Sequence, residues 1–251
     1  MEQKEYRRTS DDTRAVILFI HGIVGSPNHF NDLIALVPDS ISVYNILLEG
    51  HGRTATDFAR SSMKKWESHF KRVVDELSEK YEKIYIVAHS MGTLLSIEQA
   101  VNNSKIAELF LLSVPLKIFI KPRMVRTCAK VYINKIDPRD KYAVAARSCY
   151  GIESDINPFH YVGWIPRFFE LLGKGRAVRK LAPLIKAPCT VYQSGDDETV
   201  AYSSVKYFKD NPNVSIVTLP DSGHYYYSKE DRDLLLRDFE AFVTRIKEGM
   251  E

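Results

Sequence analysis

Long hydrophobic runs, closely spaced cysteines and an excess of one charge are all missing from this sequence of 251 residues. No apolar run approaches the roughly 18 residues of a membrane span, and the polar residues 1–14 do not resemble a signal peptide. A net charge of +3 is too small to indicate nucleic-acid binding. We therefore expect a protein that neither inserts stably in a membrane nor binds nucleic acid.

The three cysteines, Cys128, Cys149 and Cys189, are odd in number and far apart in the sequence. They lack the Cys-x-x-Cys spacing of zinc sites, so no metal site is predicted from them. Isolated cysteines are typical of reduced thiols, and we therefore expect a cytoplasmic protein.

Six apolar runs have the composition of strands that are buried on both faces. They cover residues 15–20, 41–48, 83–88, 108–114, 189–195 and 214–220. Between these runs, apolar residues recur at helical spacing within 30–37, 63–80 and 230–247. Strands that alternate with helices indicate an α/β fold with a mostly parallel sheet, whose functional site lies beyond the carboxyl ends of the strands.

Residues 115–186 interrupt this alternation. They are helical in tendency, are punctuated by prolines, and carry fifteen Lys or Arg against five Asp or Glu. We interpret this segment as a helical cap, inserted into an α/β core made of residues 1–114 and 187–251.

The sequence AHSMG at 88–92 follows directly from the strand predicted at 83–88. A nucleophile on a sharp strand-to-helix turn needs small residues two positions before and after it, as in G-x-S-x-G. Ala88 and Gly92 meet this need, and the next helix directs its N-terminus at Ser90, which favours developing negative charge. We predict that Ser90 is a catalytic nucleophile; the alternative is a plain strand-to-helix turn.

A second loop, HGIVGSP at 21–27, follows the first of the six predicted strands. The oxyanion of a tetrahedral intermediate needs two fixed N–H donors. The amide of Met91, next to the nucleophile, is one candidate. Gly22 and Gly25 give the loop freedom to bring the amide of Ile23 close as the second. The alternative is a glycine-rich turn with no catalytic role.

The acidic stretch GDDETV at 195–200 offers three candidate carboxylates after a predicted strand, Asp196, Asp197 and Glu198. A catalytic histidine needs one buried carboxylate to fix its tautomer and stabilise its charged form. We favour Asp197 for this role, because it leaves Val200 three residues later to anchor the following turn. Asp196 is the alternative acid.

The last candidate is His224, in SGHYYY at 222–227, after the final predicted strand. An imidazole with an ordinary pKa of about 6.5 suits a base that accepts a proton and returns it. His21, His51 and His89 are weaker candidates, because they precede the acid in the chain. The order nucleophile, acid, histidine is that of the α/β hydrolases.

The chain resembles the α/β-hydrolase superfamily over nearly its whole length, through HGIVGSP, LLEGHGRT, AHSMG, GDDETV and SGHYYY. Within it, the chain is similar to small bacterial carboxylesterases and monoacylglycerol-lipase-like enzymes, a likeness that Trp66 and the short cap support. The resemblance implies a sheet of about eight strands, so residues 5–9 become a further candidate strand. Ala88 departs from the strict elbow motif, in which this position is glycine.

From Ser90, His224 and Asp197 we predict a serine hydrolase that cleaves carboxylic esters through an acyl-enzyme, without a metal or organic cofactor. The resemblance points to a carboxylesterase or a monoacylglycerol or lysophospholipid lipase. Thioesterase, acyltransferase and C–C bond hydrolase activity share this triad and stay open as alternatives. A non-catalytic ligand-binding role is a further alternative.

The stretch FHYVGWIPRFFELLG at 159–173 is rich in large apolar residues. We expect Phe159, Trp164 and Phe168 to line a pocket for an apolar acyl group, unless this helix only packs on the core. Six basic residues are candidates for facing an anionic substrate or a lipid surface, although solvated helix faces are the commoner position for such residues. They are Arg123, Arg126, Lys130, Lys174, Arg176 and Arg179. The sequence leaves the oligomeric state open.

Overall fold

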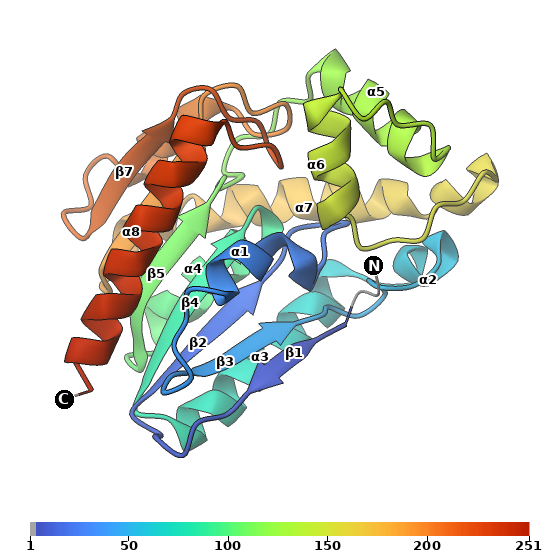
Figure 1. Cartoon of the computed structure of the whole chain (residues 1–251). Helices are drawn as coiled ribbons and strands as arrows, with labels where there is room; N and C mark the ends of the chain where they lie inside the picture. Colours follow the sequence, from blue (N-terminus) through green and yellow to red (C-terminus); the bar gives the residue numbers. More distant parts are fainter. Residues whose placement is uncertain (1–3, 251) are drawn as a thin grey trace.

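The structure, a computed structural model, describes residues 4–250 and contains one seven-stranded sheet with the order β1-β3-β2-β4-β5-β6-β7 (Figure 1). Strands β2 to β7 are parallel to one another, whereas the edge strand β1 runs antiparallel to its neighbour β3. The strands are β1 (Tyr6–Arg8), β2 (Ala15–Ile20), β3 (Ser42–Ile46), β4 (Lys83–His89), β5 (Ile106–Leu112), β6 (Cys189–Ser194) and β7 (Val214–Leu219).

The central strand β2 shows why continuous apolar runs form this sheet. All six of its side chains are buried. Val16 and Leu18 pack into the core on one face, and Ile17 and Phe19 pack into the core on the other. All six predicted strands are present as β2 to β7, and the candidate at 5–9 corresponds to β1. The burial expected on both faces is wrong for β7, because this strand lies at the edge of the sheet and only its Leu219 is buried.

Helices cover both faces of the sheet (Figure 1). The apolar sides of α3 and α4 pack into one core, and those of α1 and α8 pack into the other. The α-helices and 3-10 helices (η) outside the segment between β5 and β6 are η1 (Pro27–Phe30), α1 (Asn31–Ile34), α2 (Ala55–Ala59), α3 (Met63–Lys80), α4 (Met91–Asn102), η4 (Tyr202–Phe208) and α8 (Lys229–Glu248).

The helices predicted at 63–80 and 230–247 are confirmed as α3 and α8, each capped by a serine. The helix predicted at 30–37 is wrong in length, because only Asn31–Ile34 is α-helical after a short 3-10 turn. After Ile34 the chain continues in tighter turns, because the N–H groups of Leu36 and Val37 donate to carbonyls three residues earlier. Pro38 then disfavours the helical conformation at Val37.

The segment between β5 and β6 is helical and lies beyond the carboxyl ends of the central strands (Figure 1). It contacts the core loops through isolated β-bridges, one between Ile118 and Val200 and another between Tyr150 and Gly25. Its elements are α5 (Pro122–Tyr132), α6 (Lys141–Cys149), η2 (Pro158–Tyr161), α7 (Trp164–Val178) and η3 (Ala182–Leu184).

Candidate active site

Ser90 lies at the sharp turn between β4 and α4. Its backbone has φ 51° and ψ −121°, a positive-φ conformation that is strained for a residue with a Cβ. Two glycines make room for the turn. A Cβ on Gly92 would lie 2.5 Å from the carbonyl oxygen of Ile20, and a Cβ on Gly22 would lie 2.8 Å from the Cβ of Ser90. The neighbouring Ala88 is buried within β4.

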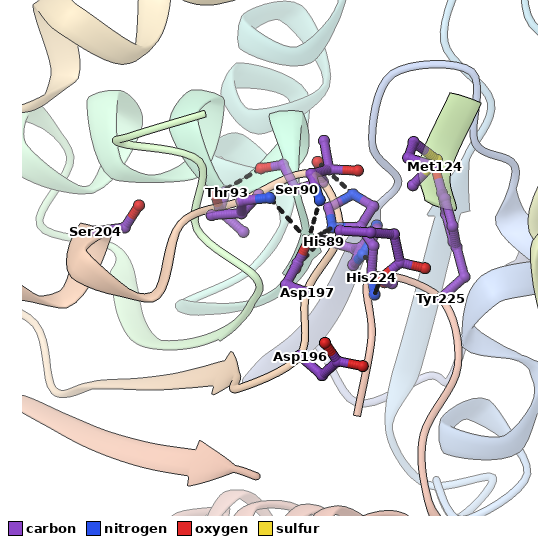
Figure 2. Close-up of polar contacts among 12 residues, drawn as sticks. His89, Ser90, Thr93, Met124, Asp196, Asp197, Ser204, His224 and Tyr225 are labelled. Atoms are coloured by element: carbon purple, nitrogen blue, oxygen red, sulfur yellow. Dashed lines mark hydrogen bonds and ion pairs between the residues drawn. The ribbon is translucent and has the colours of Figure 1, made fainter. Parts of the chain in front are cut away.

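The fold brings Ser90, His224 and Asp197 together from distant parts of the chain (Figure 2). The Nε2 atom of His224 lies 3.1 Å from the Oγ of Ser90. On the other side of the ring, Nδ1 lies 2.9 Å from Oδ2 and 3.1 Å from Oδ1 of Asp197. All three side chains are buried. One imidazole therefore contacts a hydroxyl and a carboxylate at once.

Backbone amides hold the Asp197 carboxylate in place. Its Oδ1 accepts hydrogen bonds from the N–H of Thr199 at 2.7 Å and of Val200 at 2.8 Å. Burial alone would lower the pKa of His224, but the carboxylates of Asp197 and Glu198 outweigh it and raise that pKa above its ordinary value. The site thus favours a histidine that accepts a proton.

Asp196, the alternative acid, points away from His224 (Figure 2). Its carboxylate lies 2.9 Å from Lys121 Nζ and 2.8 Å from Arg123 Nη2. It also accepts a hydrogen bond from the hydroxyl of Tyr142 at 3.0 Å. Asp196 therefore joins the segment between β5 and β6 to the core.

The loop that follows β2 passes beside Ser90. A hydrogen bond of 3.1 Å from the N–H of Gly25 to the carbonyl of Gly22 closes this loop, and Val24 takes a positive φ of 52°. Within residues 4–250, no acceptor takes the N–H of either Ile23 or Met91. Both amides are therefore free to donate to a ligand.

The family model described as "Alpha/beta hydrolase family" matches residues 17–237, which is most of the chain. The chain belongs to the alpha/beta hydrolase family. The family resemblance expected from its sequence motifs is thereby confirmed. No curated protein matches it significantly.

Solved structures similar to this alpha/beta hydrolase come from lipolytic enzymes and esterases. A metagenome-derived lipolytic enzyme superimposes with a TM-score of 0.73 at 19% identity, over 97% of this chain and 98% of the other. The monoacylglycerol lipase of Paleococcus ferrophilus gives 0.68 at 19% identity, over 97% and 99% of the two chains. A carboxylesterase structure from Nitrososphaera gargenis gives 0.65 at 19% identity, over 96% and 95%. At these identities, the likeness establishes the fold.

An apolar cavity of about 350 Å³ opens onto Ser90 and His224 in this alpha/beta hydrolase. Two residues expected to line an acyl pocket, Trp164 and Phe168, both line this cavity. Residues that the sequence analysis did not single out also do so, because they come from several elements with no common sequence signal. They include Val24, Ile118, Met124, Tyr132, Tyr150 and Tyr225.

Phe159 does not line this cavity. Its side chain is 79% exposed in the short turn η2, which places it on the outside of the molecule. Helical spacing within 159–173 did not reveal this, because the turn breaks off before α7 begins at Trp164. We therefore remove Phe159 from the expected substrate-binding residues.

The six basic residues considered as substrate contacts also lie outside the cavity lining. Arg123 pairs with Asp196, and the buried Lys174 lies between Glu67 at 2.7 Å and Glu98 at 2.5 Å. These two cations therefore attach the segment to the core instead of facing a bound substrate.

Among the described residues, the hydroxyl of Ser90 contacts the ring of His224 and of none of the other candidate histidines, His21, His51 and His89. His21 is buried, and its Nε2 accepts the N–H of Leu48 at 3.1 Å. Burial lowers the pKa of His21 to about 4. His89 contacts the carbonyl of His224 through Nε2 at 3.0 Å, and burial lowers its pKa well below the ordinary value.

Glu198 has a position that the sequence analysis did not anticipate. Its buried carboxylate accepts the backbone N–H of His224 at 2.8 Å. In the sequence, Glu198 is a candidate only for the acid itself, and no sequence pattern predicts its contact with the backbone of His224. Burial raises the pKa of this carboxyl above its ordinary value.

The described part of the chain offers no group of three His, Cys, Asp or Glu side chains that could hold a metal ion. Among residues 4–250, no helix is both long and apolar enough to cross a membrane.

Proposed function

We propose that this alpha/beta hydrolase cleaves carboxylic esters by a two-step serine mechanism. The proposal depends on the chain of contacts from Ser90 through His224 to Asp197, together with the apolar cavity that Ser90 and His224 line. Nucleophile, base and a carboxylate that orients the base form the arrangement that activates a serine.

In the first step, Ser90 Oγ attacks the ester carbonyl carbon while His224 Nε2 accepts the hydroxyl proton. The amides of Ile23 and Met91 donate to the oxyanion of the tetrahedral intermediate. Removing one such donor typically costs about 3 to 4 kcal/mol of transition-state stabilisation. Collapse of the intermediate breaks the bond to the alcohol oxygen, which takes the proton from His224 and leaves.

In the second step, water attacks the acyl group on Ser90. His224 accepts a proton from this water, and the resulting tetrahedral intermediate expels Ser90 Oγ. The proton returns to the serine, and the carboxylic acid is released. Throughout, Asp197 orients the imidazole and stabilises its charged form.

We propose that residues 115–186 act as a cap and that the cavity beneath them receives the acyl group. Trp164 and Phe168 from α7 line this cavity, as does Met124 from α5. The nearly uniform apolar lining favours an acyl chain over a charged group. The lipolytic, monoacylglycerol-lipase and carboxylesterase relatives support an ester of the carboxylesterase or monoacylglycerol or lysophospholipid lipase type.

The test is the hydrolysis of p-nitrophenyl esters of increasing chain length by the native chain and by Ser90→Ala. We expect turnover by the native chain and its loss, by about 10⁴-fold or more, in the variant. A fluorophosphonate probe is applied in parallel. Parental activity in Ser90→Ala would contradict the proposal. Labelling of Ser90 without ester hydrolysis indicates thioester, acyl-transfer or C–C chemistry, and no labelling indicates a ligand-binding role.

A further inference from the structure

The backbone of His224 is bound on both sides by residues that adjoin the other two members of the proposed triad. His89 directly precedes Ser90, and its Nε2 lies 3.0 Å from the carbonyl oxygen of His224. Glu198 directly follows Asp197, and its Oε2 accepts the N–H of His224 at 2.8 Å. Figure 2 shows His89 and His224 side by side beneath Ser90.

We propose that His89 and Glu198 form a backbone clamp that positions His224 between Ser90 and Asp197. This proposal rests on the proposed function, because it assigns both side chains to holding the base. The turn that carries Ser90 and the loop that carries Asp197 each make one contact with the ring of His224 and one with its backbone. The position of the imidazole is thereby tied to both partners at once.

The clamp matters because His224 lies in a loop and not in a helix or strand. A loop residue can shift without breaking a hydrogen-bond ladder, and a misplacement of about 1 Å costs about 100-fold in rate. The neighbouring residue is a glycine that gives Glu198 access. A Cβ on Gly223 would lie 2.6 Å from Glu198 Oε2.

Each of the two clamp residues also contacts a side chain other than that of His224. Arg123 Nη2 lies 3.8 Å from Glu198 Oε2, on the side of α5. The ring of His89 stacks on that of His29, with centroids 4.0 Å apart. His89 faces a carbonyl oxygen through Nε2, so this nitrogen carries the proton and donates.

Two substitutions at Glu198 test the clamp. Glu198→Ala removes the acceptor, whereas Glu198→Gln keeps an oxygen that can accept the N–H of His224. We expect kcat to fall about 10- to 100-fold in the alanine variant and to stay within about threefold in the glutamine variant. KM changes little in both, because Glu198 does not line the cavity. Glu79→Ala, an exposed carboxylate on α3, is the matched control.

A second pair of substitutions tests the contact between His89 and the carbonyl oxygen of His224. His89→Gln keeps an N–H donor near Nε2, and His89→Phe keeps an aromatic ring against His29 without a donor. We expect the rate of fluorophosphonate labelling of Ser90 to fall at least about tenfold in His89→Phe only. This pair also covers the case in which Glu198→Ala does not fold. An unchanged rate in Glu198→Ala or His89→Phe overturns the clamp. An equal loss in Glu198→Gln and Glu198→Ala, or in His89→Gln and His89→Phe, also overturns it.

Amide hydrogen exchange at His224 separates failure of the clamp from failure of the esterase proposal, because it needs no turnover. Exchange is expected to be slow in the native chain and in Glu198→Gln, and faster in Glu198→Ala. If the native chain hydrolyses no ester, slow exchange that depends on Glu198 still supports the clamp. Fast exchange in the native chain overturns it, whatever the activity.

Discussion

The Nδ1 atom of His224 lies 2.9 Å from Oδ2 of Asp197, and both side chains are almost fully buried. A buried carboxylate this close stabilises the imidazolium, which is why the pKa of His224 is raised although burial alone would lower it. Activity as a base requires the neutral ring. The rate is therefore expected to fall as the pH decreases through this raised pKa.

Asp197→Asn tests this relationship through the pH profile. Without the carboxylate, the pKa of His224 falls, so the acidic limb of kcat/KM moves to lower pH. The maximal kcat is expected to fall by about 10⁴-fold, because the ring loses its tautomer and orientation. A pH series with a p-nitrophenyl ester measures both effects. An acidic limb that stays in place, or moves to higher pH, contradicts the assignment of Asp197.

Asp196→Asn has a different expected outcome, because Asp196 contacts Lys121 and Arg123 and not His224. Burial opposes ionisation of Asp196, but its hydrogen bonds to Lys121, Arg123 and Tyr142 hold the pKa of this carboxyl below its ordinary value. A lowered pKa in the folded state adds stability above the unfolded pKa, and this stability disappears as the pH falls through the folded pKa.

We expect Asp196→Asn to reduce the free energy of unfolding by less than about 1 kcal/mol near neutral pH, since solvent screens this partly exposed group. The difference from the native chain shrinks in acid. Urea unfolding at several pH values measures it, with kcat/KM as the control, which is expected to stay within about threefold. A difference that grows in acid has the wrong sign for this ion pair.

Phe168→Ala and Phe159→Ala form a matched pair on the proposed cap. Phe168 lines the cavity, whereas Phe159 is 79% exposed and does not. Removing the Phe168 ring takes apolar surface away from a bound acyl chain, so KM for longer p-nitrophenyl esters is expected to rise about three- to tenfold. Phe159→Ala leaves KM unchanged. Equal effects of both variants argue against an acyl site in this cavity.

Gly92→Ala tests the close packing of the serine turn. The added Cβ meets backbone carbonyl oxygens of Ile20 and His21, which cannot move aside without displacing β2. We expect a loss of about 2 kcal/mol or more in the free energy of unfolding, with loss of activity. Gly173→Ala in α7 is the control, because nothing lies within 4 Å of the added Cβ. Its stability is expected to stay the same or rise by about 0.4 to 1 kcal/mol. A stable, active Gly92→Ala variant contradicts the packing argument.

The sequence by itself determined the sheet and the order of the site loops. The strands β2 to β6 could be located because parallel strands buried on both faces need continuous apolar runs, and such runs are local in the sequence. The edge strand β7 was located by the same kind of run, although only its Leu219 is buried. The pairing of Ser90 with His224 could be expected from chain order and from the strand ends that precede both residues. The ends of helices were harder to predict from the sequence, as the short helix before Pro38 shows.

Only the tertiary structure decided which of Asp196 and Asp197 reaches His224, and that Glu198 and His89 bind its backbone. Adjacent carboxylates look alike in a sequence, but each points to partners more than twenty residues away in the chain. The residues that line the cavity could not be predicted from the sequence either, because they come from loops and helices whose relative placement depends on packing. Local patterns specify local conformation, whereas a site of this kind depends on long-range contacts.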